Sequence, residues 1–157
     1  MQRMSVSITA LLFLACGSCS APASSPEAVR TEVQQIVRAY VDAMNKPDVT
    51  AMMEMISRGP GGSSINDGSI TRGWEAIRTA NDAVVGVSGY KMALGSIDVL
   101  PLGAANALVT VPVTITVTTD QGSSEESGAM TLVLEKSAKG WKIIHEHYSS
   151  QPEEEGE

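Results

Sequence analysis

Both histidines of the chain lie in one short segment, which also holds one of its two tryptophans. Residues 140–149 predict a β-strand, in which successive side chains face opposite ways. One predicted face carries Trp141, Ile143, His145 and His147, and the other carries Lys142, Ile144, Glu146 and Tyr148. An apolar face that ends in two imidazoles indicates the wall of a pocket more than a solid core.

A pocket of this kind could perform proton transfer, which needs a positioned base and a donor for the oxyanion that forms. His147 and Asp98 are the candidate bases. Asp98 ends a row of alternate strand residues that contains Met92, Leu94 and Ser96. If that row is buried, Asp98 could act as general base; otherwise it accepts turn hydrogen bonds at a strand end. Asp42 and Glu54 lie opposite the apolar stripes of their helices, so we expect both to face solvent.

The two histidines also have a structural interpretation, in which each bonds to the backbone or to water near the strand end. Two histidines at i and i+2 could touch a metal, but no third ligand is evident, so we expect no metal site and no cofactor. The side chains expected to line a ligand pocket are Tyr40, Met44, Trp74, Asn81, Trp141, His145 and His147.

Three helices precede the predicted strands. Ser25 is a plausible N-cap before Pro26, and an apolar stripe continues to Met44, where Asn45-Lys46-Pro47 ends the first helix. Asp48 can cap a second, shorter helix that turns Val49, Met52, Met53 and Ile56 inward. A third helix, over residues 72–85, places Trp74, Ile77, Asn81, Val84 and Val85 on one face.

From residue 90 the apolar period changes from helical to alternating. Residues 90–100, 105–118, 127–136 and 141–149 predict four strands, with a further short strand around 63–65. Valine and isoleucine alternate with threonine along residues 109–118, which is typical of an antiparallel sheet covered by helices on one face. The predicted fold class is α+β: three N-terminal helices packed on one face of a curved antiparallel sheet, an α+β roll with a pocket.

Three stretches resemble SnoaL-like domains of the nuclear transport factor 2-like superfamily, the cystatin-like α+β cone. They are the helix 32–45 leading into Asp48-Val49, the run Gly73-Trp74-Glu75-Ala76-Ile77, and the closing segment 140–149. The resemblance implies a cone-shaped pocket, with His145 and His147 near it. Some members are isomerases, cyclases or dehydratases, while many only bind, scaffold or dimerise. Residues 58–69 depart from the pattern, with glycines and serines where relatives often place an acidic or aromatic strand.

The sequence near the N-terminus predicts the cellular location of the protein. Residues 1–15 have the form of a secretory signal, and Phe13-Leu14-Ala15-Cys16 resembles a lipoprotein processing site that would acylate Cys16. Ordinary cleavage after Ala21 or Ala23 is the alternative. We expect a flexible tether over 16–25 that contains Cys19, a domain over 26–150, and an acidic tail over 151–157.

These observations predict an exported protein, lipid-anchored in the bacterial cell envelope on its periplasmic or outer surface. A net charge of −7 argues against nucleic-acid binding. The predicted function is a non-catalytic module that binds a small, largely apolar ligand or acts as a homodimeric accessory protein. The alternative is an isomerase, cyclase or dehydratase with Asp98 or His147 as general base, and a third interpretation is a purely structural envelope partner.

Overall fold

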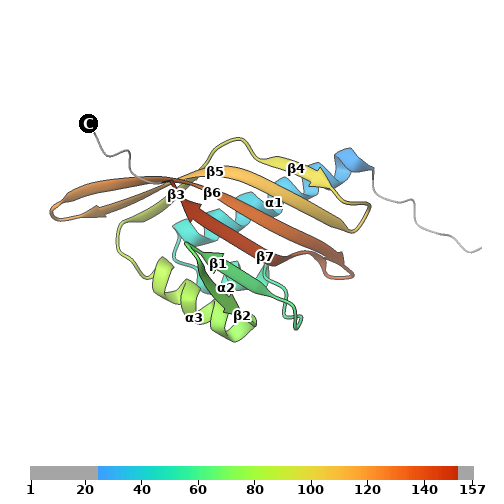
Figure 1. The fold of residues 1–157 in the computed structure, drawn as a ribbon, viewed down its shortest axis with the longest axis horizontal. Helices are drawn as coiled ribbons and strands as arrows, with labels where there is room; N and C mark the ends of the chain where they lie inside the picture. The colour runs from blue at the N-terminus through green and yellow to red at the C-terminus, as the bar shows by residue number, and fades with distance from the viewer. Residues whose placement is uncertain (1–24, 152–157) are drawn as a thin grey trace, which may run out of the picture.

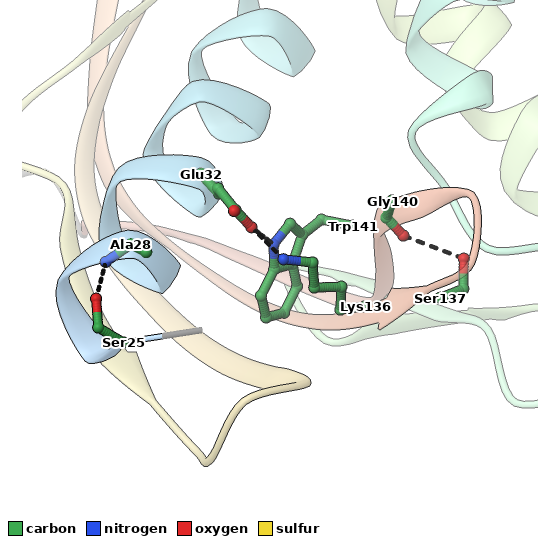
Figure 2. A network of polar contacts seen from close by, with 7 residues as sticks. All are labelled: Ser25, Ala28, Glu32, Lys136, Ser137, Gly140 and Trp141. Carbon is green, nitrogen blue, oxygen red and sulfur yellow. Dashed lines mark hydrogen bonds and ion pairs between the residues drawn. The ribbon is translucent and has the colours of Figure 1, made fainter. Parts of the chain in front are cut away.

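The longest described helix, α1 (Pro26–Asn45), begins at the predicted cap, where Ser25 Oγ accepts a hydrogen bond from the backbone N–H of Ala28 (Figure 2). The computed structural model describes residues 25–151. The predicted signal segment, the lipidation site at Cys16, Cys19 and nearly all of the acidic tail lie outside these residues. One stripe of α1 is buried, and it contains Val29, Val33, Val37, Tyr40, Val41, Ala43 and Met44.

The two shorter helices also follow the sequence signals. Asp48 caps α2 (Val49–Glu54) by accepting a hydrogen bond from the N–H of Ala51, and Met52 and Met53 are buried. Helix α3 (Trp74–Val85) starts after Gly73, which has a φ of +85° that favours glycine. It buries Ile77, Asn81 and Val85. Asp42 and Glu54 are exposed, as expected.

One curved sheet contains all the strands of the described chain, in the order β2-β1-β7-β6-β5-β3, with β4 also paired to β5. Their bounds are β1 (Ser63–Asn66), β2 (Ser69–Arg72), β3 (Tyr90–Leu94), β4 (Asp98–Pro101), β5 (Asn106–Thr119), β6 (Gly122–Ser137) and β7 (Gly140–Ser150). Helix α1 runs along one face, and α3 lies beside the β1–β2 hairpin (Figure 1). The α+β class is confirmed, but the sheet is mixed and not purely antiparallel, because β1 runs parallel to β7.

The β1–β2 hairpin lies where the sequence predicts only one short strand. Asp67 and Gly68 connect the two strands, with φ values of +44° and +84°. An Asp-Gly pair with positive φ at both positions is the favoured two-residue hairpin loop. The Asn66-Asp67-Gly68 turn predicted from the sequence is therefore the hairpin turn, and β2 is the strand that the prediction lacked.

The predicted strand 90–100 is interrupted between Leu94 and Asp98. The N–H of Gly95 donates to the carbonyl of Pro112, and the chain then rejoins β5 further along as β4. The interruption shifts the alternation by one residue: Met92 is buried before it, whereas Ile97 and Val99 are buried after it. The expectation that Asp98 ends a buried row is therefore wrong, and its side chain is exposed.

A β-bulge in β7 changes the direction of every side chain that follows it. Leu134 of β6 pairs with Ile143, but the preceding residue, Val133, pairs with His145, so Ile144 is an extra residue. Beyond the bulge, Glu146 and Tyr148 are opposite the buried side chains of Leu132 and Met130 on the inner face of the sheet. His145 and His147 are opposite Val133 and Thr131 on the outer face. The predicted shared face of Trp141, Ile143, His145 and His147 is wrong after Ile143, because a bulge resets the alternation.

Glu32 joins α1 to the end of β6 and the start of β7. Its Oε2 accepts hydrogen bonds from Lys136 Nζ at 2.6 Å and from Trp141 Nε1 at 2.7 Å (Figure 2). The Lys136 bond, followed by the Trp141 bond, holds the pKa of Glu32 below its ordinary value. Trp141 is thereby fixed in the core at the start of β7, and it does not line the cavity described below, where the sequence had placed it. No helix within residues 25–151 has the length and apolar character needed to cross a bilayer.

Candidate functional site

A cavity of about 440 Å³ opens beyond the bulge, between the inner face of the sheet, the end of α1, α3 and the β1–β2 hairpin. Its apolar wall contains side chains from two helices and three strands, namely Met44, Val84, Met92, Ile115 and Met130. Three of these are methionines, whose flexible side chains adapt to ligands of irregular shape. The cavity volume lies within the range of about 300–1,000 Å³ that is typical of small-molecule sites.

Glu146 places a carboxylate on the inner wall of this cavity. Tyr40 Oη donates a hydrogen bond of 2.6 Å to Glu146 Oε2. Burial raises the pKa of Tyr40 well above its ordinary value, the negative charge of Glu146 raises it further, and a hydrogen bond from Asn81 opposes the rise. Tyr40 therefore stays protonated and holds the carboxylate of Glu146 in one orientation.

A second tyrosine–carboxylate pair lies near the end of β7. Tyr148 Oη donates to Glu126 Oε1, and both residues line the cavity. The ring of Tyr148 lies over Gly128, where an added Cβ would come within 2.8 Å of the ring and of its hydroxyl. Burial raises the pKa of Tyr148, and the hydrogen bond to Glu126 adds to the rise. The missing side chain at Gly128 therefore makes room for the tyrosine that reaches Glu126.

Tyr90 lies close to both carboxylates. Burial raises its pKa to about 12, and the charges of Glu126 and then Glu146 contribute to the rise. Its hydroxyl is 3.9 Å from Met44 Sδ, which is a weak contact, so it can donate to a ligand. All three tyrosines of the chain, Tyr40, Tyr90 and Tyr148, are thus beside the carboxylates at this site.

The β1–β2 hairpin supplies a polar rim to the cavity. Ser64, Asn66, Ser69 and Thr71 line it with small polar side chains, together with Asp67. Asp67 Oδ1 accepts hydrogen bonds from the N–H of Ser150 at 2.8 Å and from its hydroxyl at 3.0 Å. The N–H of Asp67 donates to the carbonyl of Tyr148, so the hairpin turn is fixed to the end of β7.

Three of the seven pocket residues predicted from the sequence line the cavity: Met44, Asn81 and His147. Tyr40 acts behind the wall through its bond to Glu146. His145 Nδ1 is 2.8 Å from Ser63 Oγ, a pairing between β7 and β1. Trp74 Nε1 donates to the carbonyl of Met53.

Of the two candidate bases predicted from the sequence, only His147 lines the cavity. Asp98 is exposed on β4 and does not line the cavity. His147 lines the cavity, although β7 places it opposite Thr131 on the outer face of the sheet. Within residues 25–151, no group of three His, Cys, Asp or Glu side chains could hold a metal ion.

Sequence reasoning missed Glu146, Tyr148, Glu126 and Tyr90 as site residues. Regular alternation assigns Glu146 and Tyr148 to the face opposite Trp141, and the bulge reverses that assignment. The one signal in the sequence is the pair Ile143-Ile144, where two apolar residues interrupt the alternation. Glu126 and Tyr90 carry no signal of their own, since their roles depend on the register of β5 with β6 and β3.

A profile of the SnoaL-like domain family matches residues 33–153. The chain belongs to the SnoaL-like domain family. The resemblance stated from the sequence is thereby confirmed, and it covers the helices, the sheet and the cavity of this SnoaL-like domain. A search of curated proteins found no match.

Solved structures confirm the cystatin-like cone. A nuclear transport factor 2-like superfamily protein from Salmonella enterica has a TM-score of 0.74 at 22% identity, over 84% of this chain and 96% of that chain. A candidate dehydratase of the nuclear transport factor 2-like family from Streptomyces avermitilis has a TM-score of 0.74 at 17% identity, over 81% and 99%. A protein with a cystatin-like fold from Caulobacter vibrioides has a TM-score of 0.68 at 23% identity, over 79% and 90%. At these identities the likeness shows the fold alone.

Proposed function

We propose that this SnoaL-like domain binds a small molecule with an apolar body in the cavity lined by Met44, Met130 and Glu146. The observation that carries the proposal is the fixed carboxylate of Glu146, held by Tyr40 on the wall of an otherwise methionine-rich cavity of about 440 Å³. Such sites combine a largely apolar lining with a few polar groups that orient the ligand. Glu146 and Tyr90 are the orienting groups here.

A thermal-shift screen with a pair of variants on α3 tests the proposal. Ala80 and Ala83 are both exposed on the same helix, but only Ala80 lines the cavity. A ligand that binds in the cavity raises the melting temperature of the wild type and of Ala83→Phe, because binding to the folded state alone stabilises it. Ala80→Phe should lose that shift. If no small molecule produces a shift, or if the shift survives Ala80→Phe, binding in this cavity is ruled out.

An isomerase or dehydratase is the second candidate function, and the arrangement around Glu146 favours it. A fixed carboxylate can remove a proton next to a carbonyl, and Tyr90, which stays protonated at neutral pH, can donate to the oxyanion that forms. Glu146 thereby takes the role that the sequence gave to Asp98 or His147. Exchange of α-protons for deuterium in a bound ketone, followed by NMR, tests this activity. The exchange should vanish in Glu146→Gln; exchange at the wild-type rate in that variant would remove Glu146 from the mechanism.

We also propose that the chain is exported and anchored through a lipid on Cys16, with this domain held at the surface of the envelope. The support comes from the sequence of residues 1–25 alone. Assembly as a homodimeric accessory module belongs to the same proposal. Light scattering on the purified protein tests it, and a monomer mass at micromolar concentration would remove the dimer from the proposal.

A further inference from the structure

We propose that the ligand of the cavity is an organic cation: an amine whose charged group lies near Glu126, Glu146 and Tyr90, with its apolar body against the methionine wall. This inference rests on the proposed function and specifies the class of ligand. It follows from the charges, the aromatic rings and the apolar surface that meet at one cavity.

The charges that line the cavity are negative. Asp67, Glu126 and Glu146 contribute three carboxylates, and no lysine or arginine is among the described lining residues. The ion pairs found within residues 25–151 use other carboxylates, those of Glu27, Glu32 and Asp82. The lysine of β3, Lys91, donates to the carbonyl of Asn45. No lysine or arginine among the described lining residues neutralises the negative charge at the cavity, and His147 is the one lining side chain there that could become a cation.

Hydrogen bonds orient these carboxylates without neutralising them. Tyr40 donates to Glu146 and Tyr148 donates to Glu126, and each carboxylate has about four acceptor sites, so capacity for a ligand remains. Tyr90 reports the field that results, because the charges of Glu126 and Glu146 help to raise its pKa to about 12. A field that opposes the formation of a phenolate also favours a cation in the same place.

The remaining surfaces of the cavity favour an organic cation over a metal ion. Calcium and magnesium prefer a shell of oxygen ligands, and the described residues hold no such cluster. The ring faces of Tyr90 and Tyr148 can attract an ammonium group, and the thioethers of Met44, Met92 and Met130 can pack against its hydrocarbon part. An anion of the same size would instead be repelled by three carboxylates.

Three compounds that share one rigid apolar body but differ in charge test how the charge of the ligand affects its affinity. They are adamantylamine, adamantanol and adamantane carboxylate. Calorimetric titration of the full chain in low salt should show that the amine binds at least about tenfold more tightly than the alcohol, with the carboxylate weakest. Glu126→Gln and Glu146→Gln should each reduce amine affinity by about three- to tenfold and reduce the affinity for the alcohol by less. Glu126 is exposed, so its variant tests the inference even if Glu146→Gln unfolds.

Glu125→Gln is the matched control, because Glu125 directly precedes Glu126 in β6, is exposed and does not line the cavity. It removes the same charge and should leave amine affinity unchanged. If the alcohol or the carboxylate binds as tightly as the amine, the inference fails while binding in the cavity stands. If Glu125→Gln weakens the amine as much as Glu126→Gln does, the amine binds the acidic surface in general, and the inference fails as well. If none of the three compounds binds, the inference fails. If, in addition, no compound of the wider thermal-shift screen raises the melting temperature, the proposed function fails too.

Discussion

The hydroxyl of Tyr40 on α1 donates a 2.6 Å hydrogen bond to the carboxylate of Glu146 on β7, across a sequence separation of 106 residues. This bond joins the buried stripe of the first helix to the cavity-facing end of the last strand. Tyr40 is fully buried, whereas Glu146 is half-buried. The pair is therefore the point at which the core ends and the cavity begins.

Tyr40→Phe should lower the free energy of unfolding by about 1.5–3 kcal/mol, because it removes a hydrogen bond to a charged group that is partly shielded from water. Urea unfolding measures the change. Tyr90→Phe is the control, since the Tyr90 hydroxyl contacts only Met44 Sδ, at 3.9 Å. An equal loss in the two variants would show that the bond to Glu146 contributes nothing specific.

Alkaline titration should show all three tyrosines ionising late. The pKa values of Tyr40, Tyr90 and Tyr148 are raised, that of Tyr90 to about 12, so the folded protein holds these protons more tightly than the unfolded chain does. The stabilisation is therefore complete below the unfolded-state pKa of about 10 and is lost as pH rises towards 12. Phenolate absorbance should appear together with loss of the far-ultraviolet circular dichroism signal. A phenolate signal near pH 10 from a folded protein would contradict the structure.

Gly128→Ala should destabilise the protein by about 1–3 kcal/mol, as expected when an atom is forced into filled space. The added Cβ would come within 2.6 Å of the carbonyl oxygen of Ser149 and 2.8 Å of the Tyr148 ring. Gly61→Ala is a suitable control, because nothing lies within 4 Å of a Cβ at that glycine. Thermal unfolding compares the two variants, and equal melting temperatures would mean that Tyr148 does not lie over Gly128.

Glu32→Gln should weaken the dependence of stability on pH in acid. The pKa of Glu32 is lowered by Lys136 and then Trp141, so its contribution is present above the unfolded-state pKa and is lost as pH falls through the lower folded-state value. Melting temperatures recorded from neutral to acid pH should therefore fall less steeply in the variant. Glu27→Gln, which removes an exposed carboxylate from the same helix, is the charge-matched control. If the melting temperatures of Glu32→Gln and of the wild type fall equally steeply with pH, Glu32 does not make this contribution.

Cys16→Ser should move the protein from the detergent phase to the aqueous phase after expression in a bacterial host. The expected cause is loss of the acyl chains that the predicted processing site would attach. Phase partitioning followed by immunoblotting measures the shift, with Cys19→Ser as the control. Wild-type protein found in the aqueous phase would contradict the lipid anchor.

The helices could be predicted from the sequence because their signals are local. Ser25 with Pro26, and Asp48, are caps whose hydrogen bonds are made within one turn, and the stripe of α1 needs only its own period. The α+β class followed from the change of period at residue 90. Each of these inferences concerns residues that are close together along the chain.

Met44, Asn81 and His147 of the candidate site were predicted from the sequence, but Glu146 and Tyr148 could not be, because their direction depends on register. The interruption between Leu94 and Asp98 and the bulge at Ile144 each shift the alternation by one residue, and a shift of one residue exchanges the two faces of a strand. The sequence therefore favoured Asp98 and the two histidines, whereas the structure turns Glu146 and Tyr148 towards the cavity. Both shifts are set by pairing with distant strands, which one sequence does not show.

The bulge at Ile144 also separates two parts of β7 that could change independently. Trp141 and Ile143 pack in the core before it, and Glu146 and Tyr148 line the cavity after it. Because Ile144 has no partner of its own in the ladder, its deletion would leave His145 opposite Val133 and Glu146 opposite Leu132. Deletion of one residue after His145 would instead move each of the following side chains to the opposite face of the sheet. The strand has a spare residue at this one position, where its length can change without exchanging the side chains that line the cavity.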